Sequence, residues 1–324
     1  MKSMSKDLAR ALKVGLLLPI AEATMAGATA RWTDLKAIAK LAEAGGFDSL
    51  WVPDHLIMDF SVYGIPAETR AGVWDCWSIL AALAAVTTQV ELGTIVACVG
   101  FRNPALLAKM ADTIDEISEG RLILGLGAGH HEPEHRAFGY PFDHLVGRFE
   151  EALQIIHPLL RRGAVDFHGK YHQATECELR PRASRSAGPP ILIGTARLGP
   201  RMLRLCAQYA DYWNVVWANQ MADLLPALQA IDAACAKIGR DPATLRRSVA
   251  MAVVLPAAEQ QRTTEYWARY LFRRPPATGT VDQLADHLRT YAQKGIDHVQ
   301  LWIEPFTLSG IEAFLPVLEI LDRG

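Results

Sequence analysis

The sequence predicts an α/β fold, a (β/α)8 or TIM barrel with insertions in its βα loops, and three observations support it. Eight short apolar runs alternate with longer amphipathic stretches along the 324 residues, a pattern typical of successive βα units. The short runs are almost entirely apolar, which indicates parallel strands covered on both faces. No linker or low-complexity tract interrupts the alternation, and barrels commonly reach this length as one unit. We therefore expect residues 1–324 to form a single barrel domain.

Each element of the barrel has its own segment. The strands are expected at 14–18, 48–52, 90–97, 121–126, 190–194, 211–216, 248–254 and 297–303. The helices are expected at about 32–44, 75–87, 103–118, 147–161, 199–209, 221–238, 281–293 and 309–322. Three stretches do not fit the repeat and are predicted insertions, at about 56–74, 162–189 and 255–280. The second insertion should contain a short β-hairpin around His168, Gly169 and Lys170.

Composition and charge narrow the class of partner. A formal net charge of −2 gives no general attraction to nucleic acid or to an anionic membrane. The apolar stretch from Val14 to Ala21 is short and interrupted by Pro19, so we assign it to the first strand rather than to a signal peptide. No apolar run approaches the roughly eighteen residues of a membrane-spanning helix. We expect a cytoplasmic protein that binds a small molecule.

The cysteines agree with that compartment. They are scattered and include no C-x-x-C pair: Cys76, Cys98, Cys177, Cys206 and Cys235. This argues against a disulfide framework and against a thiolate zinc site, and it is typical of a reducing cytoplasm.

Polar and glycine-rich segments follow six of the predicted strands. In barrels the chemistry lies where strands end and βα loops begin, so these segments should share one face: Asp54 with His55, 98–103, 127–142, 194–200, Trp217 with Asn219, and Glu304. A histidine such as His55 can transfer protons near neutral pH, and the adjacent carboxylate can orient it or shift its pKa. The alternative is a histidine that only caps the next loop.

Residues 123–142, ILGLGAGHHEPEHRAFGYPF, contain two motifs that contradict each other. The first three glycines approach a dinucleotide-binding G-x-G-x-x-G, but position 130 is a histidine and no second strand with an acid follows. Residues 131–135 match the zinc-peptidase pattern H-E-x-x-H. Proline is accepted only in the first turn of a helix, so Pro133 should start a helix near Glu132 and exclude His131. We therefore expect no metal site in this stretch. The glycines either allow a ligand to approach the backbone closely or simply form a tight turn.

A second glycine-containing turn, PILIGTARLGP at 190–200, precedes a predicted helix. Backbone N–H groups at the helix start, with Arg197 and Arg201 nearby, suit a phosphate or another anion. Solvated arginines would give the same pattern. Six tryptophans at or near strand ends either line a slot for a flat ligand or belong to the core: Trp51, Trp74, Trp77, Trp213, Trp217 and Trp302.

As an ordered set, several segments resemble the bacterial luciferase-like family of flavin- and deazaflavin-dependent oxidoreductases. They are AGGFDSLWVPDH (44–55), ELGT (91–94), FRNPALLAK (101–109), DTIDEISEGR (112–121), the stretch 123–142, RFEEAL (148–153), PILIG (190–194) and ADYWN (210–214). The resemblance covers about residues 13–216 well and the last strand and helix loosely.

The resemblance implies a barrel that holds coenzyme F420 or FMN at its strand ends. The strand-four segment is most similar to the F420-using branch, where the aspartate–histidine pair lies beside the reacting ring. By this resemblance, Asp54 and His55 would have catalytic roles, and His55 would donate or accept the substrate's proton. The family's non-proline cis peptide behind the ring would fall near Val96, Ala97 and Cys98. Further cofactor contacts would fall on Gly127, Gly129, Gly194, Thr195, Ala196, Arg197 and Gly199.

Two positions depart from the family pattern. The acid that commonly follows the strand-four glycines is replaced by His130, which either takes its catalytic place or contacts the cofactor. The 194–199 loop is poorer in glycine than usual. We predict an F420-dependent oxidoreductase that transfers a hydride between the deazaflavin and a small organic substrate, assembled as a homodimer. The alternatives are an oxygen-using monooxygenase that employs reduced FMN and a non-catalytic binding protein on a degenerate barrel.

Overall fold

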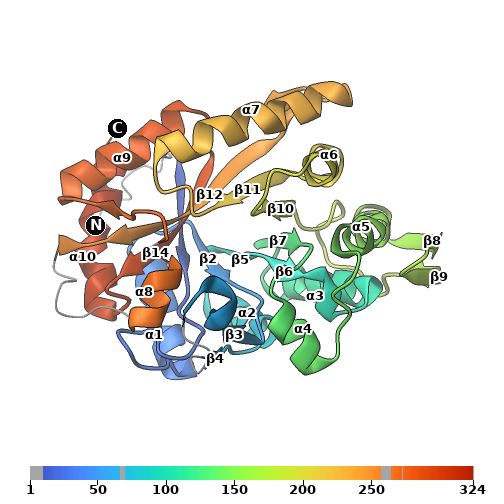
Figure 1. Cartoon of the computed structure of the whole chain (residues 1–324), viewed down its shortest axis with the longest axis horizontal. Helices are drawn as coiled ribbons and strands as arrows, with labels where there is room; N and C mark the ends of the chain where they lie inside the picture. Colours follow the sequence, from blue (N-terminus) through green and yellow to red (C-terminus); the bar gives the residue numbers. More distant parts are fainter. Residues whose placement is uncertain (1–9, 66–69, 257–263, 272, 324) are drawn as a thin grey trace.

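The computed structural model describes residues 10–65, 70–256, 264–271 and 273–323. Its centre is a closed wall of eight parallel strands (Figure 1). In order around the wall they are β1 (Lys13–Leu17), β2 (Ser49–Val52), β5 (Glu91–Thr94), β7 (Leu122–Gly127), β10 (Ile191–Thr195), β11 (Tyr212–Val216), β12 (Arg246–Val254) and β14 (His298–Glu304). The pairing of Val14 with Val299 closes the wall. Every predicted strand is present, so the (β/α)8 prediction is confirmed.

Eight helices at the predicted places surround this wall. They are α1 (Trp32–Ala44), α2 (Cys76–Val86), α3 (Pro104–Ile117), α5 (Leu145–Arg162), α6 (Pro200–Tyr209), α7 (Met221–Lys237), α9 (Val281–Gln293) and α10 (Leu308–Asp322). Several begin at a side-chain cap, such as Asn103, which accepts from two N–H groups of α3, and Thr280 in a capping box of α9. Among the described residues, no helix is both long and apolar enough to cross a membrane.

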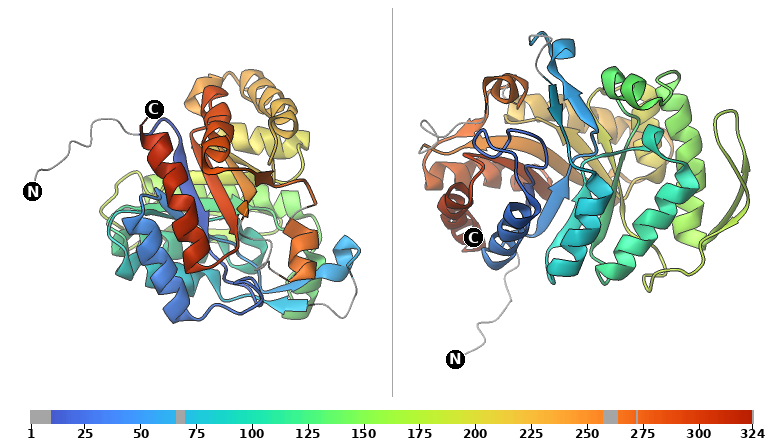
Figure 2. Two further views of the ribbon diagram at one scale, coloured as in Figure 1. Left: turned by 90° about the vertical axis from the view of Figure 1, so that its left-hand side faces the viewer. Right: turned by 90° about the horizontal axis from the view of Figure 1, so that it is seen from below.

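The insertions carry additional elements. The first forms β3 (Ile57–Asp59), the 3-10 turn η1 (Phe60–Tyr63) and β4 (Arg70–Gly72), and the third forms α8 (Glu265–Leu271) and β13 (Ala277–Thr278). Residues 66–69 and 257–263 of these insertions lie outside the described residues. The second contains the predicted hairpin, β8 (Ala164–His168) paired with β9 (Gln173–Glu178), which projects beyond α5 (Figures 1 and 2).

Short elements complete the strand-to-helix loops. They are β6 (Ala97–Cys98) with η2 (Val99–Phe101) before α3, α4 (Glu132–Phe138) after β7, and η3 (Pro242–Thr244) before β12. All five cysteines are free, as predicted.

The amino-terminal end of the barrel interior is filled by Trp51. A Cβ added to Gly93 would lie 2.2 Å from its ring and one added to Gly15 would lie 2.5 Å from its Nε1, so only glycine leaves room for the indole. The Trp51 Nε1–H donates to Oγ of Ser49 at 2.7 Å, and this oxygen lies 2.7 Å from Nε2 of His298. The filled interior leaves the carboxyl-terminal strand ends as the face where a ligand can bind.

Candidate active site at the carboxyl ends of the strands

Three histidines gather where β2 and β7 end. The ring of His55, three residues beyond β2, stands with its centroid 5.5 Å from that of His130 and 6.1 Å from that of His131. The two neighbours follow β7 and precede α4. Because β2 and β7 flank β5 in the wall, parallel strands bring these side chains to one face, as the sequence predicted.

His55 is bonded to Glu134, a residue that we did not single out from the sequence. Its Nδ1 lies 2.9 Å from Oε1 of Glu134, while Oε2 accepts the N–H of Leu56 at 2.8 Å. The Glu134 side chain is only 3% exposed and that of His55 is 18% exposed. The carboxylate is therefore shielded from solvent, while the imidazole stays partly accessible at the carboxyl-terminal face of the barrel. Burial opposes charge on the imidazole, but the hydrogen bond and the negative charge of Glu134 outweigh it and raise the pKa of His55.

Of the two roles that the sequence allowed for the adjacent carboxylate, Asp54 shifts the pKa of His55 and does not orient its ring. The buried carboxylate of Asp54 accepts two hydrogen bonds from the guanidinium of Arg102, at 2.6 Å and 3.1 Å. It also accepts the N–H of Cys98 at 3.0 Å. Asp54 acts on His55 through its charge, which adds to the rise in the His55 pKa. The pair Asp54–Arg102 therefore ties the end of β2 to the loop after β6, and Glu134 is the carboxylate that holds the histidine.

The other two histidines differ from His55 in their protonation. His131 is buried, and its Nε2 accepts the N–H of Asp59 at 2.9 Å, so this nitrogen carries no proton. The surrounding protein, and then the charge of His55, lower the pKa of His130, which nevertheless remains open to solvent. Both rings are thus neutral near pH 7, whereas His55 is the imidazole that is held ready to be protonated.

The H-E-x-x-H stretch forms no metal site. The helix α4 begins at Glu132 with Pro133 in its first turn and leaves His131 at the cap position, as predicted. His135 points elsewhere: its Nδ1–H donates to the carbonyl of Pro141 at 2.9 Å and its Nε2 lies 3.7 Å from Sγ of Cys98. In the part of the chain that the structure describes, no three potential ligands come together around one point.

The peptide bond between Ile95 and Val96 is cis, at the position that the family resemblance implied. Val96 is half-buried, and its side chain occupies the space above Gly127 and Gly194, where an added Cβ would lie 2.5 Å and 2.8 Å from its methyl carbons. These glycines therefore leave room for the Val96 side chain, which stays partly exposed. Gly129 has φ of +84° and packs against Cys98, where an added Cβ would lie 2.8 Å from the sulfur.

The 194–199 loop supplies an uncapped helix start. Ala196 and Arg197 are exposed, a Cβ on Gly199 would meet nothing within 4 Å, and α6 begins at Pro200 without a side-chain cap. First-turn N–H groups of such a helix lack internal partners. The Thr195 hydroxyl, in contrast, already accepts from Nε1 of Trp213 at 2.9 Å, so only its backbone is available to a ligand.

Arg201, which the sequence analysis placed near this anion site, is not available to an anion there, because it pairs with Glu150 at 2.6 Å. It lines a separate hollow of about 400 Å³ beside the start of α5.

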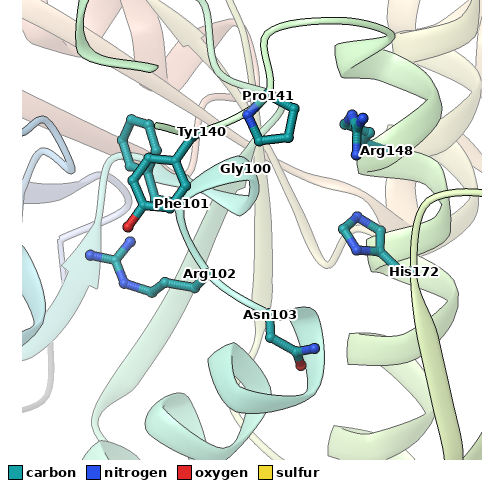
Figure 3. A pocket seen from close by; sticks show the side chains of 8 residues that line it. All are labelled: Gly100, Phe101, Arg102, Asn103, Tyr140, Pro141, Arg148 and His172. Carbon is teal, nitrogen blue, oxygen red and sulfur yellow. The ribbon is translucent and has the colours of Figure 1, made fainter. Parts of the chain in front are cut away.

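A second hollow of about 260 Å³ is lined by residues of η2, of the loop after α4 and of α5 (Figure 3). Figure 3 shows Phe101, Arg102 and Tyr140 on one side of it and Arg148, from α5, with His172 across the gap. Arg102 lines this hollow, and its guanidinium holds Asp54, so this residue connects the two regions.

The tryptophans divide into core and surface. Trp51, Trp77, Trp213 and Trp302 are buried, whereas Trp74 is 43% exposed. Most of them therefore belong to the core.

Glu134 and Arg102 are the two residues that the sequence analysis missed. Glu134 lies inside the rejected zinc motif, where the signal was an acid in the first turn of a short helix after a glycine-rich strand. Arg102 precedes the N-cap Asn103 in FRNP and looked like part of a helix start. Neither partner is near in sequence: Glu134 is 79 residues from His55, and Arg102 is 48 from Asp54.

Comparisons with known proteins agree with this architecture. Residues 12–277 match the sequence model of the luciferase-like monooxygenase family. A phthiodiolone/phenolphthiodiolone dimycocerosates ketoreductase of Mycobacterium bovis (strain BCG / Pasteur 1173P2) is 31% identical over 222 residues, which are 64% of this chain and 58% of that protein. A pyrimidine monooxygenase of Stutzerimonas stutzeri (strain A1501) is 32% identical over 220 residues, or 63% of this chain and 56% of that protein. The chain thus spans less than two thirds of the length of these curated relatives.

Two solved structures are similar over nearly their whole length. An F420-dependent secondary alcohol dehydrogenase in complex with an F420-acetone adduct has a TM-score of 0.76 at 19% identity and covers 96% of this chain and 99% of its own. The monooxygenase RslO1 from Streptomyces bottropensis has the same TM-score at 20% identity, covering 95% and 99%. At such identities the likeness shows the fold.

Proposed function

Because the chain belongs to the luciferase-like monooxygenase family, we propose that it is an F420-dependent oxidoreductase that transfers a hydride between the deazaflavin and a small organic carbonyl compound or alcohol. The observation that carries this proposal is the His55–Glu134 pair, 2.9 Å apart and shielded at the strand ends. Ketoreductase and F420-dependent alcohol dehydrogenase activities named for the similar proteins support the same class of reaction.

The residues of the carboxyl-terminal face fit a deazaflavin. Val96 offers an apolar surface for a flat ring, built on Gly127 and Gly194, which have no side chains to obstruct it. The exposed Arg197 and the open N–H groups at the start of α6 suit the cofactor's phosphate. When bound, F420 supplies a carbon-centred hydride donor or acceptor. Further proposed contacts with the cofactor come from the backbone of Ala97, Cys98, Gly129, Thr195, Ala196 and Gly199.

The proton is the part of the reaction assigned to the protein itself. Hydride arrival at a carbonyl carbon leaves negative charge on its oxygen, and a general acid within hydrogen-bond distance supplies the proton. With Nδ1 bonded to Glu134, His55 presents Nε2 to the substrate. Glu134 stabilises the imidazolium, Asp54 adds a more distant negative charge, and the neutral His130 can accept or donate a hydrogen bond beside it.

Titration of the purified protein with F420 and with FMN, followed by fluorescence, tests the cofactor. We expect F420 to bind at micromolar concentration and FMN more weakly. Replacement of Arg197 by glutamine should weaken F420 binding about tenfold, as for one charge-assisted phosphate contact, whereas replacement of the Glu150-bound Arg201 should not. Failure of both cofactors to bind would contradict the enzyme proposal and favour a non-catalytic binding protein.

An FMN-dependent monooxygenase is the second candidate, favoured by the 32% identity to the pyrimidine monooxygenase. The two differ in kind, because F420 lacks the ring nitrogen that makes reduced flavins reactive toward oxygen. Oxygen uptake that depends on reduced FMN and on an organic substrate would establish this alternative. Turnover with F420 under anaerobic conditions would establish the first.

A further inference from the structure

We propose that Arg273 selects substrates that carry a carboxylate, and that such a substrate extends from His55 to this arginine. The inference rests on the proposed function only in that His55 marks the reacting end of the substrate. It assigns a substrate class and a specificity-determining residue, and this residue lies in the third insertion.

Two aromatic rings hold the Arg273 guanidinium in place. Its central carbon lies 4.8 Å from the ring centroid of Tyr63 and 4.9 Å from that of Tyr270, and its Nε–H donates to the carbonyl of Tyr270 at 3.1 Å. The two tyrosine rings, which come from the first and third insertions, are themselves 4.8 Å apart. Cation–π contacts of this kind orient a guanidinium without neutralising its charge, so the terminal nitrogens remain available as donors.

No carboxylate of the described chain neutralises this charge, in contrast to its neighbours. Arg274 lies 3.5 Å from Asp223 and Arg269 lies 2.6 Å from Glu265, while no described acid lies within 4.0 Å of a nitrogen of Arg273. A planar guanidinium matches a carboxylate with two parallel hydrogen bonds, better than an ammonium can. A cation that is fixed by rings and left without an acid is arranged to receive the acid from a ligand.

A chain of ring contacts connects Arg273 with His55. The Tyr63 ring stacks on His131 at 5.8 Å with an angle of 14° between the planes, and His131 and His130 both adjoin His55. The charge of Arg273 reaches His130, where it contributes to the lowered pKa of that ring after burial and the neighbouring histidines. His130 therefore stays neutral and does not compete for the substrate's carboxylate.

Arg273 differs from the other cationic groups near His55 in having no described carboxylate partner. His55 has Glu134 and Arg102 has Asp54, which leaves Arg273 as the unneutralised cation among these described groups. A substrate with a carbonyl or hydroxyl at one end and a carboxylate at the other would complete both ends of the site.

A series of keto acids and their methyl esters tests the proposal: 4-oxopentanoate, 6-oxoheptanoate and 8-oxononanoate. Their dissociation constants would be measured by titration calorimetry, with the protein alone and with F420 present. We expect at least one acid to bind about tenfold to a hundredfold more tightly than its ester, as charge-assisted hydrogen bonds would give. Arg273→Gln should remove that preference and Arg273→Lys should restore part of it, while Arg274→Gln should leave it intact.

Three outcomes would overturn the assignment: equal binding of acids and esters, no binding of any acid, or a preference that survives in Arg273→Gln. A fourth, weaker F420 binding in Arg273→Gln with the acid preference unchanged, would assign the arginine to the cofactor. Thermal melting of each variant shows that it is folded. Since the preference can be measured without a cofactor, failure of F420 binding would refute the proposed function and leave this inference standing.

Discussion

Two histidines at opposite ends of the barrel, one buried and one partly exposed, have opposite protonation behaviour. His298 begins β14 at the amino-terminal end, where its Nε2 meets the hydroxyl of Ser49 at 2.7 Å; burial, and then the charge of Lys13, lower the pKa of His298 to about 3. His55 lies at the carboxyl end, where its Nδ1 meets the carboxylate of Glu134 at 2.9 Å. There the carboxylate outweighs burial and raises the pKa of His55.

The difference lies in the partner more than in the burial. A hydroxyl can bond to the neutral imidazole but offers no charge to offset the desolvation of an imidazolium, whereas a carboxylate does. His298 is thereby restricted to packing beside Trp51, and His55 becomes able to exchange a proton near neutral pH. The chemistry expected at each end follows from one neighbouring side chain.

Replacement of His55 tests the comparison with the largest expected effect. His55→Gln keeps a polar group of similar size but cannot transfer a proton, so kcat for F420-dependent ketone reduction should fall about 10²- to 10⁴-fold, the usual contribution of general acid catalysis. F420 binding should change little. His168→Gln, in the exposed hairpin, is the control, and a His55→Gln enzyme that retains its full kcat would remove His55 from the reaction.

Glu134→Gln should move the pH profile rather than abolish activity. In the proposed reaction, ketone reduction needs protonated His55, so the rate should be full below the raised pKa and decline as pH increases through it. Loss of the carboxylate should shift this decline about one to three pH units lower, with a rate loss of about tenfold per unit on the alkaline side. Glu132→Gln, an exposed acid of the same helix, should leave the profile unchanged. An unmoved profile in Glu134→Gln would mean that another group tunes His55.

The barrel was predictable because its signals are local. Strand and helix periodicity, Pro133 at a helix start, and the hairpin of the second insertion are all encoded within a few residues of where they act. The face on which the site lies follows from strand ends, which placed Asp54, His55 and His130 together.

The partners of those residues were not predictable in the same way. Asp54 precedes His55 in the chain, so it was the obvious carboxylate, yet its buried oxygens are taken by Arg102. The bond from Glu134 depends on the direction in which α4 leaves β7, which periodicity does not encode. Likewise, the glycines of β7 and β10 indicated open space, and only packing reveals that Val96 occupies it.

The smallest predicted effect concerns His298 and the stability of the fold. Its pKa is about 3 in the folded state against about 6.5 in an unfolded chain. The stability due to the neutral ring is complete above pH 6.5 and is lost as pH falls toward 3, because the unfolded state binds the proton first. Between pH 6.5 and 5 the loss should be about 2 kcal/mol. Urea unfolding at both pH values should therefore show a steeper decrease for the wild type than for His298→Gln, which cannot titrate. Equal decreases would mean that His298 is protonated within the barrel, and the contrast with His55 would then be one of degree.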